Sequence, residues 1–580
     1  FVTHFISEMQ PLEYTPSPIF PKTNPSDPIY LDYNATTPVD PEVAKAMWPF
    51  MTQYFGNPSS GHVYGKLAKE GVENARSSIA KMINAKPEEI LFLSGGSESI
   101  NQALIGGVRT LNDKRRTIIA SCFEHPAVNE TLAFLEKEYG FKIVHLRVDT
   151  HGFVDVDQLE LVLSPDVAMV TCMLANNEIG SIQPIAEMVR RVRAFEHSAE
   201  GNGRILFHCD ASQAGGKMRV DAKALGVDYM TMAGHKIYAT KGVGILYISE
   251  AAPCPAKIIH GANQEGGRRA GTENVILCVG MGKAAELINE NLDADMKRMH
   301  ALKTKLKRLL LDRSPVNVRV NSSLSADPYA EDDDTDKYLS NTLSIAFEGM
   351  LSSSLLSMMG SKLCTSAGAA CHSAEAISVS EVLRAVHCPL SYAIGTLRLS
   401  VGRYTTEQDV EDAAEIIIAA VYKLLEQPSV NQKLAWELYN IDPESIYKTP
   451  VVASVNKNIE VLSNAITQVR VLVTECDRMA RQCNAKQAEL EEKLIRVIGK
   501  LESKSAKSQI VVTNEAFVET LVKLQRSISL PSSGLQSRLS AVYSALNTYG
   551  VTIPEDSVKL EDAENVLKFL QNQETALEKI

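Results

Sequence analysis

Short apolar runs alternate with amphipathic segments from residue 29 to about residue 421, and this alternation constrains the fold more than any other feature. The apolar runs have the length of strands, as at Glu89–Leu93, Val167–Thr171, Arg204–His208 and Val243–Ile248. Strands that are separated by helices pair mostly in parallel, in a sheet whose two faces are both covered. The pattern therefore predicts an α/β fold with a large, mostly parallel sheet.

The composition changes after Pro428. Only three of the 33 glycines lie in residues 429–580, and apolar residues recur there in steps of three and four from Ile459 to Leu501. Such heptads predict a long coiled-coil helix. Shorter seams at 517–528 and 535–546 and a last helix at 560–577 complete an all-α domain over 429–580. The proline-rich residues 1–28 predict an irregular arm.

Charge and cysteine usage exclude several classes of protein. The net charge is −11, and no basic patch is present, so we expect no nucleic-acid partner. No apolar run approaches the roughly 18 to 20 residues that span a bilayer, so we expect no membrane span. The ten cysteines are scattered without a C-x-x-C pair, and Glu331–Asp336 reads as a solvated loop, so we predict no metal site.

The segment Ala233–Gly244 is the most informative one for chemistry. It places Lys236 beside a histidine in a glycine-flanked turn that leads into an apolar strand. A lysine in this setting can form a Schiff base with an aldehyde cofactor. Taken alone, the same residues also fit an ordinary loop.

Two further segments supply the other parts of a pyridoxal phosphate site. Asp210 ends a predicted strand, where ligands collect in parallel sheets, and could hold a proton on the ring nitrogen. A helix N-cap is the alternative role for that aspartate. Ser94–Ser99 follows another strand and could hold a phosphate at a helix N-terminus. Its spacing fits neither of the common glycine-rich nucleotide motifs.

Several motifs resemble the class V aminotransferase-like cysteine desulfurases, in order along residues 29–425. They are Ile29–Pro38, Phe55–Ser60, Glu124–His125, Asn176–Gly180, His208–Gln213, Gly234–Lys236, Arg269–Thr272 and Arg398–Arg403. The resemblance implies a fold type I enzyme over 29–428, with a small subdomain made of 29–45 and 290–428. Within the family, Ser366–Ser373 is most similar to selenocysteine lyases.

The resemblance also implies a role for each site residue. Lys236 would bind pyridoxal 5'-phosphate, and His125 would stack on its ring and assist proton transfer. Asp210 would pair with the ring nitrogen, while Asn177 and Gln213 would orient the phenolic oxygen. The residues implied for the phosphate are Gly96, Ser97, His235 and Thr272. Thr272 would come from a neighbouring subunit, which implies a homodimer.

The implied reaction removes sulfur or selenium from cysteine or selenocysteine and leaves alanine. Arg398 and Asn34 would bind the substrate, and Cys371 would be the nucleophile, which must react as a thiolate. Ala233 departs from the family pattern, because many desulfurases have a phosphate-binding serine there. An aminotransferase-fold enzyme that uses Lys236 without Cys371 is an alternative.

The C-terminal segments Trp436–Glu444, Ile459–Leu501 and Leu535–Val542 resemble the α-helical domain of the central-channel FG-nucleoporins over 430–580. This implies nucleoporin partners for residues 459–580, and a generic dimerising coiled coil is the alternative. A helical scaffold subunit with an inactive or artificially fused enzyme part is therefore a second hypothesis for the whole chain. We expect a cytoplasmic protein, with the nuclear pore as an alternative; because the sequence begins at Phe1, a mitochondrial location stays open.

Overall fold

The computed structural model describes residues 27–447, apart from 112–114, 199–200, 202, 326, 331–335, 368–378 and 444. The chain divides into two compact units, Phe1–Tyr447 and Lys448–Ile580. The predicted heptad helices, most of the N-terminal arm and Cys371 lie outside the described residues. The description below concerns the first unit, and no helix described there is long and apolar enough to cross a membrane.

The first unit consists of a larger and a smaller part, each with its own sheet. A seven-stranded sheet forms the centre of the larger part. Every neighbouring pair is parallel except the two pairs that involve β8, so the predicted mostly parallel sheet is confirmed. In order across the sheet, the strands are β2 (Ile90–Leu93), β8 (Gly244–Ile248), β7 (Tyr229–Ala233), β6 (Leu206–Asp210), β5 (Val167–Thr171), β3 (Thr117–Ser121) and β4 (Lys142–Leu146).

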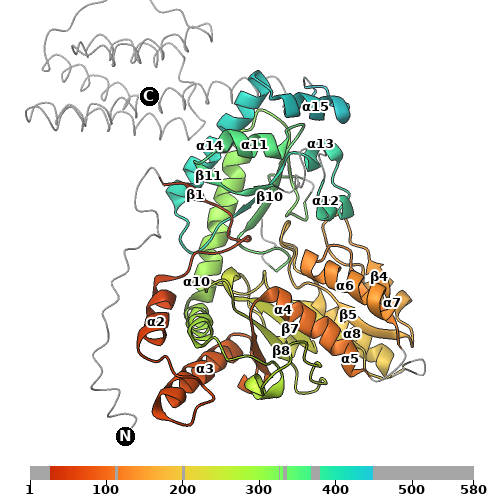
Figure 1. Ribbon diagram of the computed structural model, residues 1–580. Coiled ribbons are helices and arrows are strands. Elements are labelled where there is room, and N and C mark those ends of the chain that lie inside the picture. Colours follow the sequence, from red (N-terminus) through yellow and green to blue (C-terminus); the bar gives the residue numbers. More distant parts are fainter. Residues whose placement is uncertain are drawn as a thin grey trace, which may run out of the picture. The chain divides into compact units, whose positions relative to one another are not determined.

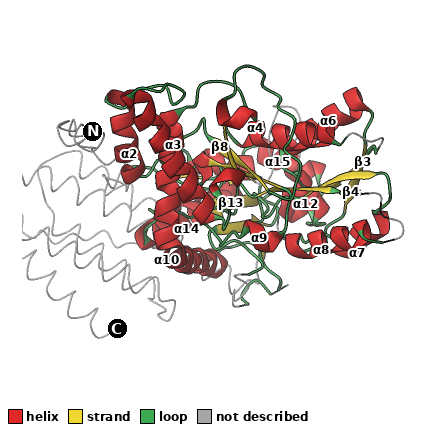
Figure 2. Cartoon of the chain, turned by 90° about the horizontal axis from the view of Figure 1, so that it is seen from below, coloured by secondary structure: helices red, strands yellow, loops and turns green. Residues whose placement is uncertain are grey.

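Helices cover both faces of this sheet, as Figure 2 shows edge-on. Alternate side chains of each strand enter different cores: Leu91 and Leu93 face one core, whereas Ile90 and Phe92 face the other. The first core is closed by α4 (Gly96–Asn101), α5 (Gly107–Thr110) and α6 (Pro126–Tyr139). The second is closed by α2 (Pro41–Thr52), α3 (Val63–Met82), α7 (Val156–Val162), α8 (Ile185–Glu196) and α9 (Ala222–Leu225).

A single helix of 39 residues, α10 (Val275–Arg313), runs from the large part into the smaller one (Figure 1). Its residues Cys278 and Ile288 lie in the core of the large part, and Met299 and Leu311 lie in a separate core of the small part. That small part contains an antiparallel sheet, a parallel strand pair and flanking helices. The sheet has the order β12 (Ser366–Ala367), β13 (Thr396–Ser400), β10 (Thr342–Phe347) and β9 (Val318–Val320), and the pair is β1 (Ile29–Tyr30) with β11 (Leu363–Cys364). Its core is covered by α11 (Ser352–Met359) and α14 (Glu407–Glu426), whereas α12 (Glu381–Ala385) and α13 (Leu390–Ala393) contribute Val382, Leu383 and Ala393 to the core of the large part.

Two boundaries of the small part differ from the expected ones. Ile29 lies in its core, but Val43 of α2 packs in the core of the large part, so the N-terminal share is shorter than 29–45. At the other end, α15 (Val430–Leu438) joins the first unit, although we expected the helical domain to begin at 429. Trp436 fixes it, because its Nε1 donates to the carbonyl of Gly349 at 2.6 Å.

Candidate active site

Four predicted site residues lie at the carboxyl ends of adjacent parallel strands. His125 follows β3, Asn177 follows β5, Asp210 ends β6 and Lys236 follows β7. Because these strands are neighbours in the sheet and run in one direction, their ends meet at a single edge. The fold therefore brings an amine, a carboxylate, an imidazole and an amide together at one edge of the sheet, although they are far apart in the sequence.

Lys236 ends a short 3-10 turn, η3 (Gly234–Lys236), whose first residue must be a glycine. A Cβ at Gly234 would lie 2.8 Å from Cγ1 of Val243, which is too close. The Nζ of Lys236 donates to the carbonyls of Asn34 at 2.6 Å and Ala35 at 2.8 Å. Burial, together with the nearby Arg398 cation, lowers the pKa of Lys236 to about 8. At pH 7 roughly a tenth of this amine is therefore uncharged, far more than for an ordinary lysine with a pKa of about 10.4.

Asp210 and His125 complete the charge arrangement around that amine. Asp210 is 7% exposed, and its Oδ1 accepts from the backbone N–H of Ser212 at 3.0 Å. It caps no helix, because the next helix, α9, begins at Ala222 with Asp221 as its N-cap. His125 caps α6, and desolvation by surrounding protein atoms is the main cause that lowers its pKa. The charges of Asp210 and Lys236 both act on that imidazole, in opposite directions.

Arg398 extends from β13 of the small part toward the same edge. Its Nη1 donates to the carbonyl of Asn177 at 3.0 Å, and its Nη2 donates to Asp32 at 2.8 Å and to Ser366 at 3.0 Å. Its Nε is buried without a partner among the described residues. A buried, unpaired N–H is costly, so this nitrogen indicates where an added carboxylate would bind. Asp32 is a partner that the sequence analysis did not assign.

Asn34 differs from its predicted role as a substrate contact. The side chain is 1% exposed, and its Nδ2 donates to Thr342 at 2.8 Å and to the carbonyl of Asn177 at 3.2 Å. Its Oδ1 accepts from Lys217 at 3.1 Å and from Asn341 at 3.0 Å. No amide atom remains for a substrate. Asn34 instead connects the N-terminal segment with both sheets and offers its backbone carbonyl to Lys236.

The predicted phosphate loop joins β2 to α4 and packs against the ends of the neighbouring strands. A Cβ at Gly96 would lie 3.4 Å from Cβ of Ala233 and 3.6 Å from Oγ of Ser212. Ser97 is exposed at the start of α4. Burial lowers the pKa of His235 to about 4, with Lys236 as the next cause, so its imidazole is neutral at physiological pH. These residues offer hydroxyl, amide and imidazole groups to a phosphate.

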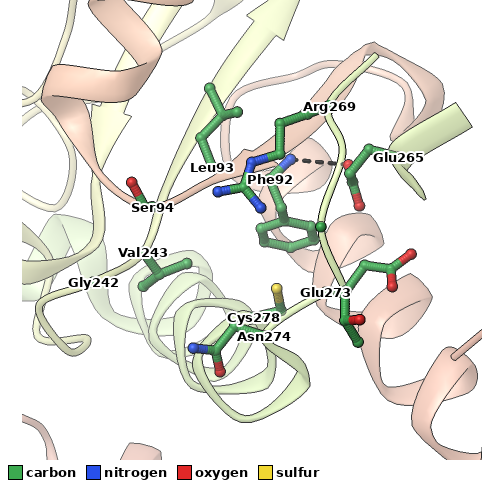
Figure 3. A pocket seen from close by; sticks show the side chains of 12 residues that line it. Phe92, Leu93, Ser94, Gly242, Val243, Glu265, Arg269, Glu273, Asn274 and Cys278 are labelled. Atoms are coloured by element: carbon green, nitrogen blue, oxygen red, sulfur yellow. Dashed lines mark hydrogen bonds between the residues drawn. The ribbon is translucent and has the colours of Figure 1, made fainter. Parts of the chain in front are cut away.

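Thr272 lines a pocket whose lining includes none of Lys236, Asp210 and His125. Figure 3 shows this pocket with Arg269 and Glu265 among its lining residues. Arg269 lines the same pocket and pairs with Glu98 at 2.9 Å. The other lining residues are Phe92, Leu93, Ser94, Gly242, Val243, Glu265, Gly271, Glu273, Asn274 and Cys278. The role of Thr272 in the site of a neighbouring subunit stays a prediction.

Three buried polar residues near the site were not assigned from the sequence. Glu124 accepts from the backbone N–H of Met173 at 2.9 Å, and burial raises its pKa to about 7. His208 bridges the hydroxyls of Thr171 and Thr231 across three strands. Lys217 donates to Gln213 at 2.7 Å. No periodicity marks these residues, because their partners come from other strands and loops.

The cysteines of the described part lack the environment of a nucleophile. They are Cys122, Cys172, Cys209, Cys254, Cys278, Cys364 and Cys388, and burial raises the pKa of every one of them. A raised pKa reduces the thiolate that reacts. Cys371, Cys476 and Cys483 lie outside the described residues.

Known proteins with similar sequences support one class of enzyme. The aminotransferase class-V family model matches residues 29–412, and the chain belongs to this family. A cysteine desulfurase, IscS, from Dictyoglomus turgidum is 39% identical over 399 residues, which cover 68% of this chain and 95% of that protein. A cysteine desulfurase from a Nostoc species is 38% identical over 410 residues, which cover 70% of this chain and 96% of that protein.

Solved structures give the same result. A NifS-like protein is 34% identical with a TM-score of 0.61, and the match covers 68% of this chain and 99% of that one. The structure of SspA in complex with cysteine is 30% identical with a TM-score of 0.54, covering 65% and 99%. The expected fold type I architecture is therefore confirmed for the first unit, and the class V family uses pyridoxal 5'-phosphate.

The residues present fit this cofactor. An amine with a lowered pKa stands beside a buried carboxylate, and both act on one imidazole. Gly96 of the predicted phosphate loop lies next to Ala233 and Ser212, at the ends of the strands that carry Lys236 and Asp210. Lys236 could bind the aldehyde, Asp210 could hold the ring nitrogen, and the loop after β2 could hold the phosphate.

Proposed function

We propose that this protein removes the sulfur atom of L-cysteine and releases L-alanine, with selenium of L-selenocysteine as the second candidate atom. The observation that carries the proposal is the joint placement of Lys236, Asp210 and the unpaired Nε of Arg398 around one sheet edge. The relatives named cysteine desulfurases support the reaction class. The Ser366–Ser373 motif motivates the selenium alternative.

Each residue has a distinct task in this proposal. Arg398 binds the substrate carboxylate through its unpaired Nε. Lys236 moves the proton of the substrate α-carbon, and His125 assists with a neutral imidazole. When bound, pyridoxal phosphate supplies the electron sink for the negative charge left on that carbon. Asp210 keeps a proton on the ring nitrogen, and Cys371 accepts the sulfur atom as a persulfide while the carbon–sulfur bond breaks.

We also propose a homodimer, because the family resemblance assigns Thr272 to the site of a neighbouring subunit and the pocket that Thr272 lines includes none of Lys236, Asp210 and His125. The direct test of the function uses the purified full-length chain, supplied with pyridoxal phosphate. Alanine is measured from cysteine and from selenocysteine in parallel. Alanine formation from either substrate supports the proposal, and the ratio of the two rates selects sulfur or selenium. A protein that binds the cofactor but forms no alanine from either would overturn it.

The rate of cofactor binding should depend on pH through the protonation of the Lys236 amine. Only the uncharged amine attacks an aldehyde, and burial lowers its pKa to about 8. We expect the rate at which the cofactor-free protein binds pyridoxal phosphate to rise up to about pH 8 and to level off above it. Absorbance after rapid mixing measures this rate. A rate that keeps rising toward the ordinary lysine value of about 10.4 contradicts the expectation.

The Arg398→Lys substitution should weaken substrate binding and spare the cofactor. Lysine keeps the positive charge but lacks the Nε donor and the planar fork. We expect kcat/KM for cysteine to fall about 100-fold, mainly through KM, as the loss of one good charge-assisted hydrogen bond predicts. Arg190→Lys, on the exposed face of α8, is the matched control. An unchanged KM in Arg398→Lys would count against the assigned contact.

A further inference from the structure

Lys217 is a buried lysine that the proposed reaction does not use. It is 4% exposed and lies in the turn that follows β6, seven residues after Asp210. Its Nζ donates to Oε1 of Gln213 at 2.7 Å and to Oδ1 of Asn34 at 3.1 Å. Burial, followed by the charges of Lys236 and Arg398, lowers its pKa well below the usual value. Charged or neutral, the nitrogen keeps enough hydrogens for both bonds.

These contacts fix which way the Gln213 amide faces. Its Oε1 accepts from Lys217, and its Nε2 donates to the carbonyl of Asn34 at 3.0 Å. A reversed amide would place its NH₂ group against the Lys217 donor and its oxygen against the carbonyl. The bond to the Asn34 carbonyl would be lost and two oxygens would face each other there, at a site where Gln213 is only 7% exposed. The donor end of the amide therefore stays on the side away from Lys217.

That donor end lies beside the reactive amine. The carbonyl of Asn34 that accepts from Gln213 also accepts from Nζ of Lys236 at 2.6 Å. Nε2 of Gln213 and Nζ of Lys236 therefore lie no further apart than the sum of these two hydrogen-bond distances. An amide nitrogen carries two hydrogens, so one remains for a group that is bound to Lys236.

We propose that Lys217 is a positioning residue that holds the Gln213 amide with its N–H toward the phenolic oxygen of the bound cofactor. The inference rests on the proposed function, because it requires the cofactor to be joined to Lys236. With the cofactor bound, a donor from Gln213 would stabilise negative charge on that oxygen. It would thereby lower the pH at which the absorbance of the bound cofactor changes.

Lys217→Met tests the proposal by a pH titration of the bound cofactor's absorbance. Methionine fills a similar volume but cannot donate, so Gln213 is free to reverse. We expect the midpoint to rise by about one pH unit, because one unit corresponds to the net effect of one hydrogen bond to a charged group. Lys303→Met is the matched control. Lys303 lies in α10 and is also buried, at 3% exposed, but it donates to the carbonyl of Leu339 and not to Gln213.

The double variant separates positioning from general disturbance. Gln213→Leu alone removes the donor and should raise the midpoint as Lys217→Met does. If Lys217 acts through Gln213, adding Lys217→Met to Gln213→Leu changes the midpoint no further. Additive shifts would overturn the proposal. If Lys217→Met does not fold, Lys217→Gln, whose shorter chain cannot reach both acceptors, decides by the same midpoint.

The failure of this inference and the failure of the proposed function give different results. A wild-type protein that stays colourless with pyridoxal phosphate overturns both. A coloured wild type with an unshifted midpoint in Lys217→Met overturns the inference alone. A raised midpoint in Lys217→Met, with Lys303→Met unchanged, supports it. The affinity of the cofactor-free protein for pyridoxal phosphate, measured by absorbance, should fall in Lys217→Met but not in the control.

Discussion

The Lys236→Ala protein is expected to be colourless after dialysis and inactive. The substitution removes both the covalent attachment of the cofactor and the group that moves the substrate proton. General acid–base catalysis alone accounts for roughly 10² to 10⁴ in rate, so we expect kcat to fall by at least about 10⁴-fold. The bound-cofactor absorbance and alanine formation measure the two losses separately.

The fold should survive this change, because within the described part of the chain Nζ of Lys236 donates only to two backbone carbonyls, those of Asn34 and Ala35. Lys69→Ala, on the exposed side of α3, provides the control and should keep both colour and activity. Circular dichroism of the two variants should agree. A yellow and fully active Lys236→Ala protein would reject the assignment of this lysine.

Cys371→Ala is expected to abolish desulfuration of cysteine while the cofactor stays bound. A thiolate must receive the sulfur atom, and burial raises the pKa of each of the seven cysteines in the described part. None of those seven is suited to the task. We expect sulfide release and alanine formation from cysteine to fall by at least about 10³-fold, because a nucleophile has no substitute in an alanine side chain.

Cys254→Ala is the matched control, since Cys254 is exposed and distant in sequence from the proposed nucleophile. It should retain wild-type turnover. Selenocysteine is assayed beside cysteine, because Cys371 could assist release of selenium differently from release of sulfur. Unchanged turnover of both substrates in Cys371→Ala would remove this residue from the mechanism and favour an enzyme that uses Lys236 without it.

The local pattern of apolar residues was sufficient to predict the strands of the large sheet. The apolar run Val167–Thr171 is a strand with the same limits in the structure, and Val243–Ile248 differs from β8 by one residue. The antiparallel direction of β8 was missed, although only about ten residues separate it from β7 and a parallel crossover needs about a dozen or more. Asp210 was found at the end of β6 because ligand-binding residues collect at the carboxyl ends of parallel strands.

The contacts between distant segments were not predictable from one sequence. Asp32 pairs with Arg398 across 366 positions, and Lys217 meets Asn34 across 183. A lysine in the run Ala214–Lys217 carries no local sign of burial. Trp436 was assigned to the helical domain because the composition changes after Pro428, whereas its indole packs on the small part. The role of Asn34 differed for a related reason, because every amide partner of that side chain comes from a remote element.

The continuity of α10 determines how the first unit comes apart. One half of this helix contributes to the core of the large part and the other half to that of the small part. Unfolding of either core therefore destabilises the shared helix, and the other core loses part of the helix that it packs against. The two parts should therefore unfold in a single cooperative transition. Cleavage within 290–300 would divide α10, and each core would then be packed against a helix segment with a free end.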